Sequence, residues 1–116
     1  MASAVKRLLS GSTDGKGIKV VASASPGTLI HTAVVGTTPG SYDEVWLWAY
    51  NSDIANVTLF VEWGDTDLPR KTSIPLQSGL VPVIPGLLLQ NGQTVRIYAS
   101  APNVVKIDGF VNRIVD

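Results

Sequence analysis

Two strand-like segments, residues 42–50 (YDEVWLWAY) and residues 57–63 (VTLFVEW), carry apolar side chains at both alternating positions. Together they hold all three tryptophans, two of the three tyrosines and one of the two phenylalanines. A strand with one face in a core and the other in water should alternate apolar with polar residues. In the first segment one face would carry Val45, Leu47 and Ala49, and the other would carry Trp46, Trp48 and Tyr50. A chain of 116 residues has little left to cover that second face, so either a second sheet of the same domain or another chain must cover it.

Turn residues punctuate the rest of the chain at short intervals, with 11 glycines and 7 prolines. Between them lie runs rich in Val, Ile, Thr and aromatic residues, which suit a pleated and half-buried surface. No window of useful length favours an amphipathic helix. The pattern predicts strands near residues 4–9, 18–24, 28–35, 43–50, 56–63, 71–75, 80–84, 94–100 and 104–114. Short, regularly spaced strands of this kind indicate an all-β fold, as a single-domain antiparallel β-sandwich or a jelly-roll-like barrel.

Three local signals predict how these strands end or pair. Asn91-Gly92 lies between two strand-like runs, which is the strongest short-range signal for a β-hairpin; the alternative is a loop turn of another type. Pro82 and Pro85 cannot donate to a strand ladder, so their run should be an edge strand or an extended connection. Gly109 interrupts the long last strand, which indicates a bulge or a bend there.

The first 17 residues differ from the rest of the chain. They hold Lys6, Arg7 and Lys16, three of the nine basic residues, and end in a linker of Ser, Gly, Thr and Asp. We predict an extended N-terminal arm over residues 1–17 and a β-sandwich domain over residues 18–116. One interpretation of this segment is a frayed terminus with one short strand. The other is an arm that becomes ordered against a neighbouring subunit.

Charge and composition narrow the classes of partner. Nine basic and nine acidic residues give a formal net charge near zero, whereas nucleic acids and anionic membranes attract clustered excess Lys and Arg. We therefore expect no nucleic-acid partner and no membrane partner. The charged fraction of 16% lies below the typical value of about 25%. A neutral, weakly charged surface protects poorly against self-association, which favours a chain that works as part of an assembly.

The sequence contains no cysteine, which excludes disulfides and thiolate metal sites. No segment approaches the ~20 apolar residues of a membrane span. The N-terminus has no apolar run long enough for a signal peptide, so we expect a chain that is made without a secretion signal.

Residues that could carry chemistry are sparse. His31 is the only histidine and lies in the middle of a predicted strand, where a packed or surface role is far more common than catalysis. Asp65 and Asp67 could bind a cation through hard oxygen ligands, but this spacing is common in β-turns, where Asp caps the backbone. No nucleophile elbow, P-loop or dinucleotide-binding glycine motif is present. We expect a protein that is not an enzyme, without catalytic, cofactor-binding or metal-binding residues.

Several short phrases of the sequence carry a family resemblance. They are VKRLLSGSTDGKGIKV at 5–20, DEVWLWA at 43–49, FVEWG at 60–64, VIPGLLLQNG at 83–92 and GFVNRI at 109–114. In these phrases the chain resembles small all-β virion structural proteins of tailed bacteriophages, most closely the capsid decoration (cement) proteins. The resemblance covers nearly the whole chain and includes no catalytic motif.

This resemblance implies a structural protein of the virion, made in the host cytoplasm and placed on the capsid surface. It implies a homotrimer that binds the major capsid protein and staples neighbouring capsid subunits. The alternatives are a head–tail connector, a stopper or another tail component and, from a different class, a carbohydrate-binding module that stacks sugars on tryptophan. Our candidate residues for the subunit or capsid interface come from the arm and the aromatic strands: Lys6, Arg7, Leu8, Trp46, Trp48, Tyr50 and Phe60.

Overall fold

The computed structural model describes residues 3–116, which form nine strands and contain no helix. The strands are β1 (Ser3–Leu8), β2 (Ile18–Lys19), β3 (Thr28–Thr32), β4 (Tyr42–Asn51), β5 (Val57–Trp63), β6 (Arg70–Ile74), β7 (Val81–Leu89), β8 (Thr94–Ala99) and β9 (Val105–Val115). Over this part of the chain, no helix is long and apolar enough to cross a bilayer.

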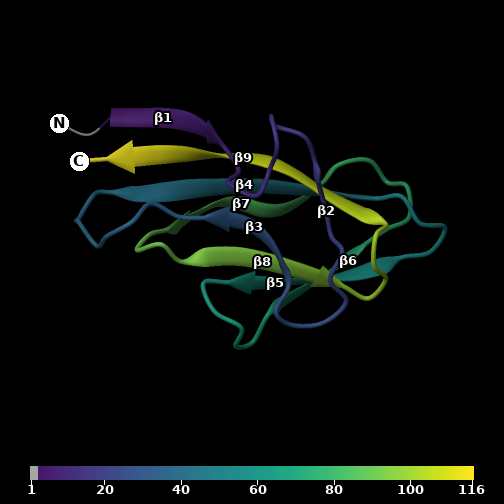
Figure 1. The fold of residues 1–116 in the computed structure, drawn as a ribbon. Helices are drawn as coiled ribbons and strands as arrows, with labels where there is room; N and C mark the ends of the chain where they lie inside the picture. Colours follow the sequence, from purple (N-terminus) through teal and green to yellow (C-terminus); the bar gives the residue numbers. More distant parts are fainter. Residues whose placement is uncertain (1–2) are drawn as a thin grey trace.

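The strands pair as a nested antiparallel series. β5 pairs with β6, β4 with β7, β3 with β8, and β9 with both β1 and β2. The chain is therefore arranged like one long hairpin, with its turn between β5 and β6, that is rolled into two sheets (Figure 1). The larger sheet has the order β1-β9-β4-β7, with β2 also on β9, and the smaller has the order β3-β8-β5-β6. This nested order is that of a jelly roll.

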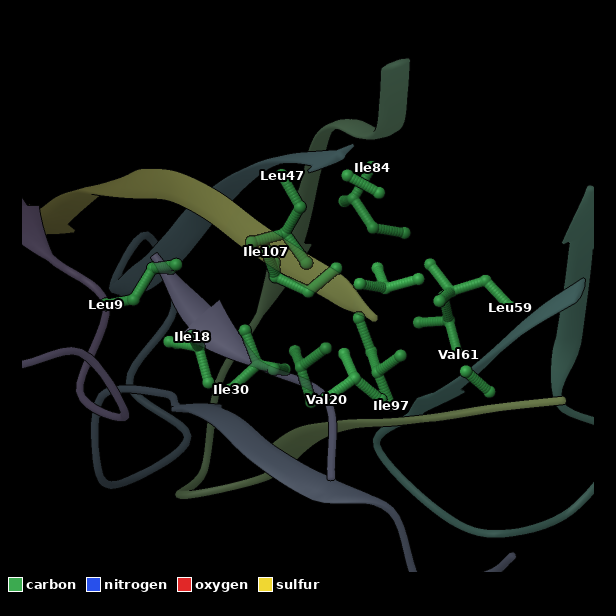
Figure 2. Close-up of a cluster of buried hydrophobic side chains, with 14 of the residues drawn as sticks. Leu9, Ile18, Val20, Ile30, Leu47, Leu59, Val61, Ile84, Ile97 and Ile107 are labelled. Atoms are coloured by element: carbon green, nitrogen blue, oxygen red, sulfur yellow. The ribbon is translucent and has the colours of Figure 1, made fainter. Parts of the chain in front are cut away.

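The core lies between the two sheets. Figure 2 shows aliphatic side chains from both of them pointing into the same space, among them Ile30, Leu47, Leu59, Val61, Ile84, Ile97 and Ile107. β4 alternates between half-buried and buried positions along its whole length, with Val45, Leu47 and Ala49 facing inward. The smaller sheet thus covers the aliphatic face of β4, and Trp46, Trp48 and Tyr50 point away from the core.

The predicted fold class is confirmed, because residues 3–116 form two antiparallel sheets in one domain. Most predicted strand ranges agree with the structure to within two residues, but the second and third strands are shorter than predicted, and the third ends at Thr32 instead of residue 35. β2 ends at Lys19 because the backbone N–H groups of Val21 and Ala22 donate to the Thr28 hydroxyl, at 3.1 and 3.2 Å, instead of to a ladder.

The proline-containing run forms an edge strand, as predicted. β7 lies at the edge of the larger sheet and continues to Leu89, five residues past the predicted end of this strand at residue 84. Pro85 lies opposite Trp46 and Pro82 opposite Trp48, and the register with β4 shifts at both places. An edge strand has one side without ladder partners, so it can accommodate residues that lack an N–H group.

The predicted hairpin at Asn91-Gly92 is wrong. Both residues have positive φ, at 63° and 66°, so the tight turn itself forms. The strands that it joins belong to different sheets, however, since β7 pairs with β4 and β8 pairs with β3 and β5. The turn is held by Val34, whose carbonyl accepts the Gly92 N–H at 3.0 Å.

The predicted bulge at Gly109 is also absent. β9 keeps an unbroken register with β4 from Val105 to Ile114. A Cβ atom at position 109 would collide with the backbone carbonyl oxygen of Trp46, so the glycine is needed for close approach of the two strands.

The structure incorporates the described part of the predicted N-terminal arm into the sandwich. β1 pairs with β9 from Ser3↔Val115 to Leu8↔Phe110. Leu9 is buried in the core, and the Gly11 N–H donates to the Ile30 carbonyl at 3.0 Å. Residues 1–2 of the predicted arm lie outside the described residues.

Candidate functional site

The outward side of the larger sheet carries a group of aromatic rings drawn from two strands. β4 and β9 pair Trp46 with Phe110, and β1 places Leu8 opposite Phe110 on the next strand. Trp48 lies two residues along β4 from Trp46, so it points to the same side. We call this surface the aromatic face and define it by Lys6, Leu8, Trp46, Trp48 and Phe110.

The three rings of the aromatic face stack on one another. Their centroids lie 6.4 Å apart for Trp46–Trp48, 6.4 Å for Trp46–Phe110 and 6.1 Å for Trp48–Phe110, with interplanar angles of 18°, 14° and 26°. The ammonium of Lys6 lies 5.0 Å from the centroid of Phe110, within the range of a cation–π interaction. These contacts order the rings on the outside of the molecule.

Trp46 is held in place by its neighbours. Its indole Nε1–H donates to Glu44 Oε1 at 2.8 Å, and Asn112 Nδ2 donates to the same oxygen at 3.0 Å. The bonds from Asn112 and Trp46 lower the pKa of the Glu44 carboxyl below its ordinary value, because they stabilise the charged form. Gly86 of β7 lies against the indole ring, and a Cβ atom there would come within 2.7 Å of it.

The structure brings five of the seven candidate interface residues to one side of the molecule. Lys6, Leu8, Trp46 and Trp48 belong to the aromatic face, and Tyr50 lies on the same side, two residues beyond Trp48. Arg7 sits on the opposite side of β1 from Lys6 and Leu8 and lines a hollow beside the core.

Phe60 lies on the outward side of the other sheet. Its ring stacks on Tyr98 with centroids 4.6 Å apart and an interplanar angle of 6°, and the ammonium of Lys71 lies 5.7 Å from its centroid. It therefore belongs to a different surface from Trp46 and Trp48.

Phe110 is the member of the aromatic face that sequence reasoning missed. The alternation of β9 contains the signal, since Val105, Ile107 and Val111 are buried and Phe110 falls at an outward position between them. Phe110, like Trp46 and Trp48, is an aromatic residue at an outward strand position where a polar residue is expected.

A buried polar cluster lies on the inward side of the same end of the larger sheet. His31 and Asp43 are 1% and 0% exposed, and His31 Nε2 lies 2.7 Å from Asp43 Oδ2. Arg113 forms a two-pronged ion pair with the same carboxylate, with Nε at 2.8 Å from Oδ1 and Nη2 at 3.0 Å from Oδ2. The Ser10 backbone N–H donates to His31 Nδ1 at 3.0 Å.

These bonds fix the protonation state of the cluster. Because His31 Nδ1 accepts from Ser10, its proton is on Nε2, which donates to Asp43. Burial lowers the pKa of His31 below its ordinary value and outweighs the opposing effect of Asp43. Burial alone would raise the pKa of Asp43, but the hydrogen bonds from Arg113 and His31 outweigh it and lower that pKa.

The cluster ties four parts of the chain together and borders an open hollow of about 440 Å³. Both imidazole nitrogens of His31 are engaged, and the Ser10 hydroxyl accepts the Thr32 N–H at 2.7 Å. No nitrogen of His31 is left to take a proton from a substrate, so the geometry is that of a structural joint between β3, β4, β9 and the segment after β1.

The acidic residues near the end of β5 have separate roles. Asp65 Oδ1 accepts the Asp67 N–H at 3.0 Å in an exposed turn. Glu62 is 2% exposed and accepts hydrogen bonds from the Ser25 hydroxyl and the Gly27 N–H, which fastens that loop to the smaller sheet. Within residues 3–116, no three His, Asp or Glu side chains are grouped so that they could hold a metal ion.

Fold and surface together define a class: an antiparallel jelly-roll sandwich whose larger sheet carries an outward aromatic face. Comparison with family models, with curated proteins and with solved structures finds no match to this chain.

Proposed function

We propose that this chain is a non-enzymatic structural protein of a tailed-phage virion that decorates and stabilises the capsid by binding the major capsid protein through the aromatic face. The observation that carries the proposal is the stack of Trp46, Trp48 and Phe110 on the outside of a sandwich whose core is complete without them. The phrases that resemble phage decoration proteins support the same assignment. Jelly rolls occur in viral capsid domains and also in lectins, so the fold alone does not separate these functions.

The aromatic face is suited to binding protein. Trp and other aromatic residues are enriched among the side chains that dominate binding energy in protein interfaces. The rings are already ordered by stacking, by the Glu44 hydrogen bond and by Gly86, so little conformational entropy is lost when a partner covers them. Apolar side chains flank them, with Leu8 58% and Leu88 50% exposed.

A sugar-binding platform fits this geometry less well. A pyranose ring stacks on the open face of an aromatic ring, whereas the Lys6 ammonium lies over the ring of Phe110, 5.0 Å from its centroid. We therefore favour a protein partner over a carbohydrate.

The proposal includes a homotrimer on the capsid surface. A formal net charge near zero does not oppose self-association, and a cyclic arrangement would present three copies of the aromatic face to the shell in equivalent positions. Light scattering on the purified chain, alone and with capsids, measures the oligomer. A chain that stays monomeric in both would contradict the trimer.

Capsid binding tests the function directly. Capsids assembled without this chain are mixed with the parent protein, with Trp46→Ala and with Phe60→Ala, and binding is measured by co-sedimentation. We expect Trp46→Ala to weaken binding at least about tenfold, because buried aromatic anchors each contribute about 2 kcal/mol or more. Phe60→Ala removes a stacked aromatic from the other sheet and serves as the matched control.

Three outcomes would reject the proposal in different ways. No binding of the parent protein to capsids would reject capsid decoration. Equal losses for Trp46→Ala and Phe60→Ala would reject the aromatic face as the contact. Density only in a ring at the portal vertex, in images of the virion, would assign the chain to the connector or tail.

A further inference from the structure

Two lysines lie directly opposite each other at one end of the outward side of the larger sheet. β2 and β9 pair Lys19 with Lys106, and β4 and β9 pair Lys106 with Tyr50. Three neighbouring strands therefore place one outward side chain each in a row: Tyr50 on β4, Lys106 on β9 and Lys19 on β2. Tyr50 is two residues from Trp48 along β4, a separation of about 6.6–6.8 Å, so this row adjoins the aromatic face.

Like charges directly opposite on neighbouring strands destabilise a sheet. Among residues 3–116, neither Lys19 nor Lys106 has a carboxylate oxygen within 4.0 Å, since the ion pairs there are those of Asp43 with His31 and Arg113. The acidic residue two positions along β9, Asp108, lies beside Gly17 together with the side chain of Lys106, but its carboxylate oxygens are more than 4.0 Å from the Lys106 ammonium. Among the described residues, therefore, neither of these two lysines has a direct ion-pair partner.

The two lysines border a hollow of about 330 Å³. Its other walls come from Tyr50, Ser52, Asn103 and Val104. The Ser52 hydroxyl is engaged with the Val104 carbonyl at 2.7 Å, while Tyr50 and Asn103 contribute polar groups of a kind that can donate to an oxygen ligand. A hollow lined by two lysines and by neutral donors has the chemistry of a site for an anionic oxygen group.

We propose that this dibasic hollow receives an acidic side chain of the protein that covers the aromatic face. The inference rests on the proposed function and adds to it that the covering surface is apolar where it meets Trp46, Trp48 and Phe110 and carries Asp or Glu where it meets Lys19 and Lys106. Charge complementarity carries the assignment: a carboxylate held between the lysines removes a repulsion that the free chain retains.

The free protein supplies the first test. Lys106→Gln removes the repulsion, so we expect the melting temperature to rise by about 1–4 °C at low salt. The gain should shrink at 1 M NaCl, where the Debye length is about 3 Å. Lys71→Gln, a lysine of the smaller sheet, is the matched control and should show no such salt-dependent gain. If the melting temperature of Lys106→Gln falls, or if its change does not depend on salt, the proposed repulsion between Lys19 and Lys106 is contradicted.

Ligand binding supplies the second test, and it does not require capsids. Succinate, a dicarboxylate, should shift the NMR signals of the Lys19 and Lys106 side chains in a saturable way, and the neutral diamide succinamide should not. Equal shifts with both compounds, or none with succinate, would reject the carboxylate site. Shifts with inorganic phosphate but not with succinate would assign the hollow to phosphate and overturn the proposal.

Capsid binding then links the hollow to the partner. The double variant Lys19→Gln/Lys106→Gln should bind capsids about tenfold more weakly than the parent and with a smaller dependence on salt. If the double variant binds like the parent while Trp46→Ala does not, the hollow is rejected and the proposed function stands. If the parent does not bind capsids, the proposed function fails, and the succinate titration alone decides whether the hollow is a carboxylate site.

Discussion

The two sides of β4 differ in what covers them, although they alternate along one strand. On the inward side, Asp43 and Val45 are fully buried, and Asp43 is held by partners from β3 and β9. On the outward side, Glu44 and Trp46 are half-buried and bond to each other. The inward side is completed by the chain itself, whereas the outward side is ordered and partly exposed. Changes on the inward side should therefore affect folding, and changes on the outward side should affect binding.

The adjacent carboxylates Asp43 and Glu44 offer the strongest contrast. Asp43→Ala leaves the His31 and Arg113 groups without their common partner, and removal of one member of a buried ion pair costs about 3–5 kcal/mol. We expect urea unfolding to show a loss of this size. Glu44→Ala removes a carboxylate on the outward side and should leave the unfolding midpoint close to that of the parent. Equal losses for the two variants would contradict the contrast between the two sides.

Trp46→Ala should cost less stability than Asp43→Ala while it weakens binding. The ring lies outside the core, so its loss removes stacking on Trp48 and Phe110, which contributes about 0.5–1.5 kcal/mol per aromatic pair. Thermal melting and capsid co-sedimentation on the same samples separate the two effects. A loss of stability as large as that of Asp43→Ala would show that the ring is part of the fold.

Gly86→Ala tests whether the ring of Trp46 is held in position. Gly86 and Gly79 both have positive φ, at 82° and 80°, so alanine strains the backbone at either site, by about 1 kcal/mol. Only at Gly86 does the new Cβ meet the indole, at 2.7 Å, whereas nothing lies within 4 Å at Gly79. Tryptophan fluorescence should shift for Gly86→Ala alone. A shift of the same size for Gly79→Ala would contradict this placement.

The buried cluster predicts how stability depends on pH. The pKa of His31 is lowered in the folded state from 6.5, so the unfolded chain binds a proton first and stability falls as the pH drops below about 6.5. The pKa of Asp43 is lowered from 3.8, so its contribution is present above that pH and is lost as the pH falls through the folded value. Urea titrations from pH 8 down to about pH 2 measure both phases.

His31→Gln should remove the upper of these two phases and leave the lower one. Stability of the parent that is constant or rises from pH 7 to pH 5 would contradict the assignment of a neutral, buried His31.

The sequence predicts the positions of the strands and their inward faces because both depend on local pattern. The alternation in residues 42–50 is enough to place Val45 and Trp46 on opposite faces, and the prolines at 82 and 85 mark an edge. Alternation does not reveal which distant strand is the neighbour. The hairpin predicted at Asn91-Gly92 is wrong for this reason. The turn forms, but the strands on either side of it belong to different sheets.

The features of the site that could not be predicted from the sequence depend on which distant strands are neighbours. Asp43 shares the inward side with Val45, which signals a buried carboxylate, but Arg113 lies 70 residues away and reaches it only through the pairing of β4 with β9. Phe60 and Trp46 have the same aromatic character, and only the strand order assigns them to different sheets. The sequence gives the residue type at each position, whereas the set of residues that share a binding face depends on which distant strands pair.

The nested pairing of the strands has a consequence for folding. β5 and β6 are joined by a short connection, whereas Ser3 and Val115 come from the two ends of the chain and lie side by side (Figure 1). Loop-closure entropy therefore favours β5–β6 pairing early and β1–β9 pairing last. Because β1 carries Lys6 and Leu8, we expect the aromatic face to be complete only after β9 has been synthesised and has paired with β1. Amide hydrogens of β1 should then exchange with solvent sooner than those of β5.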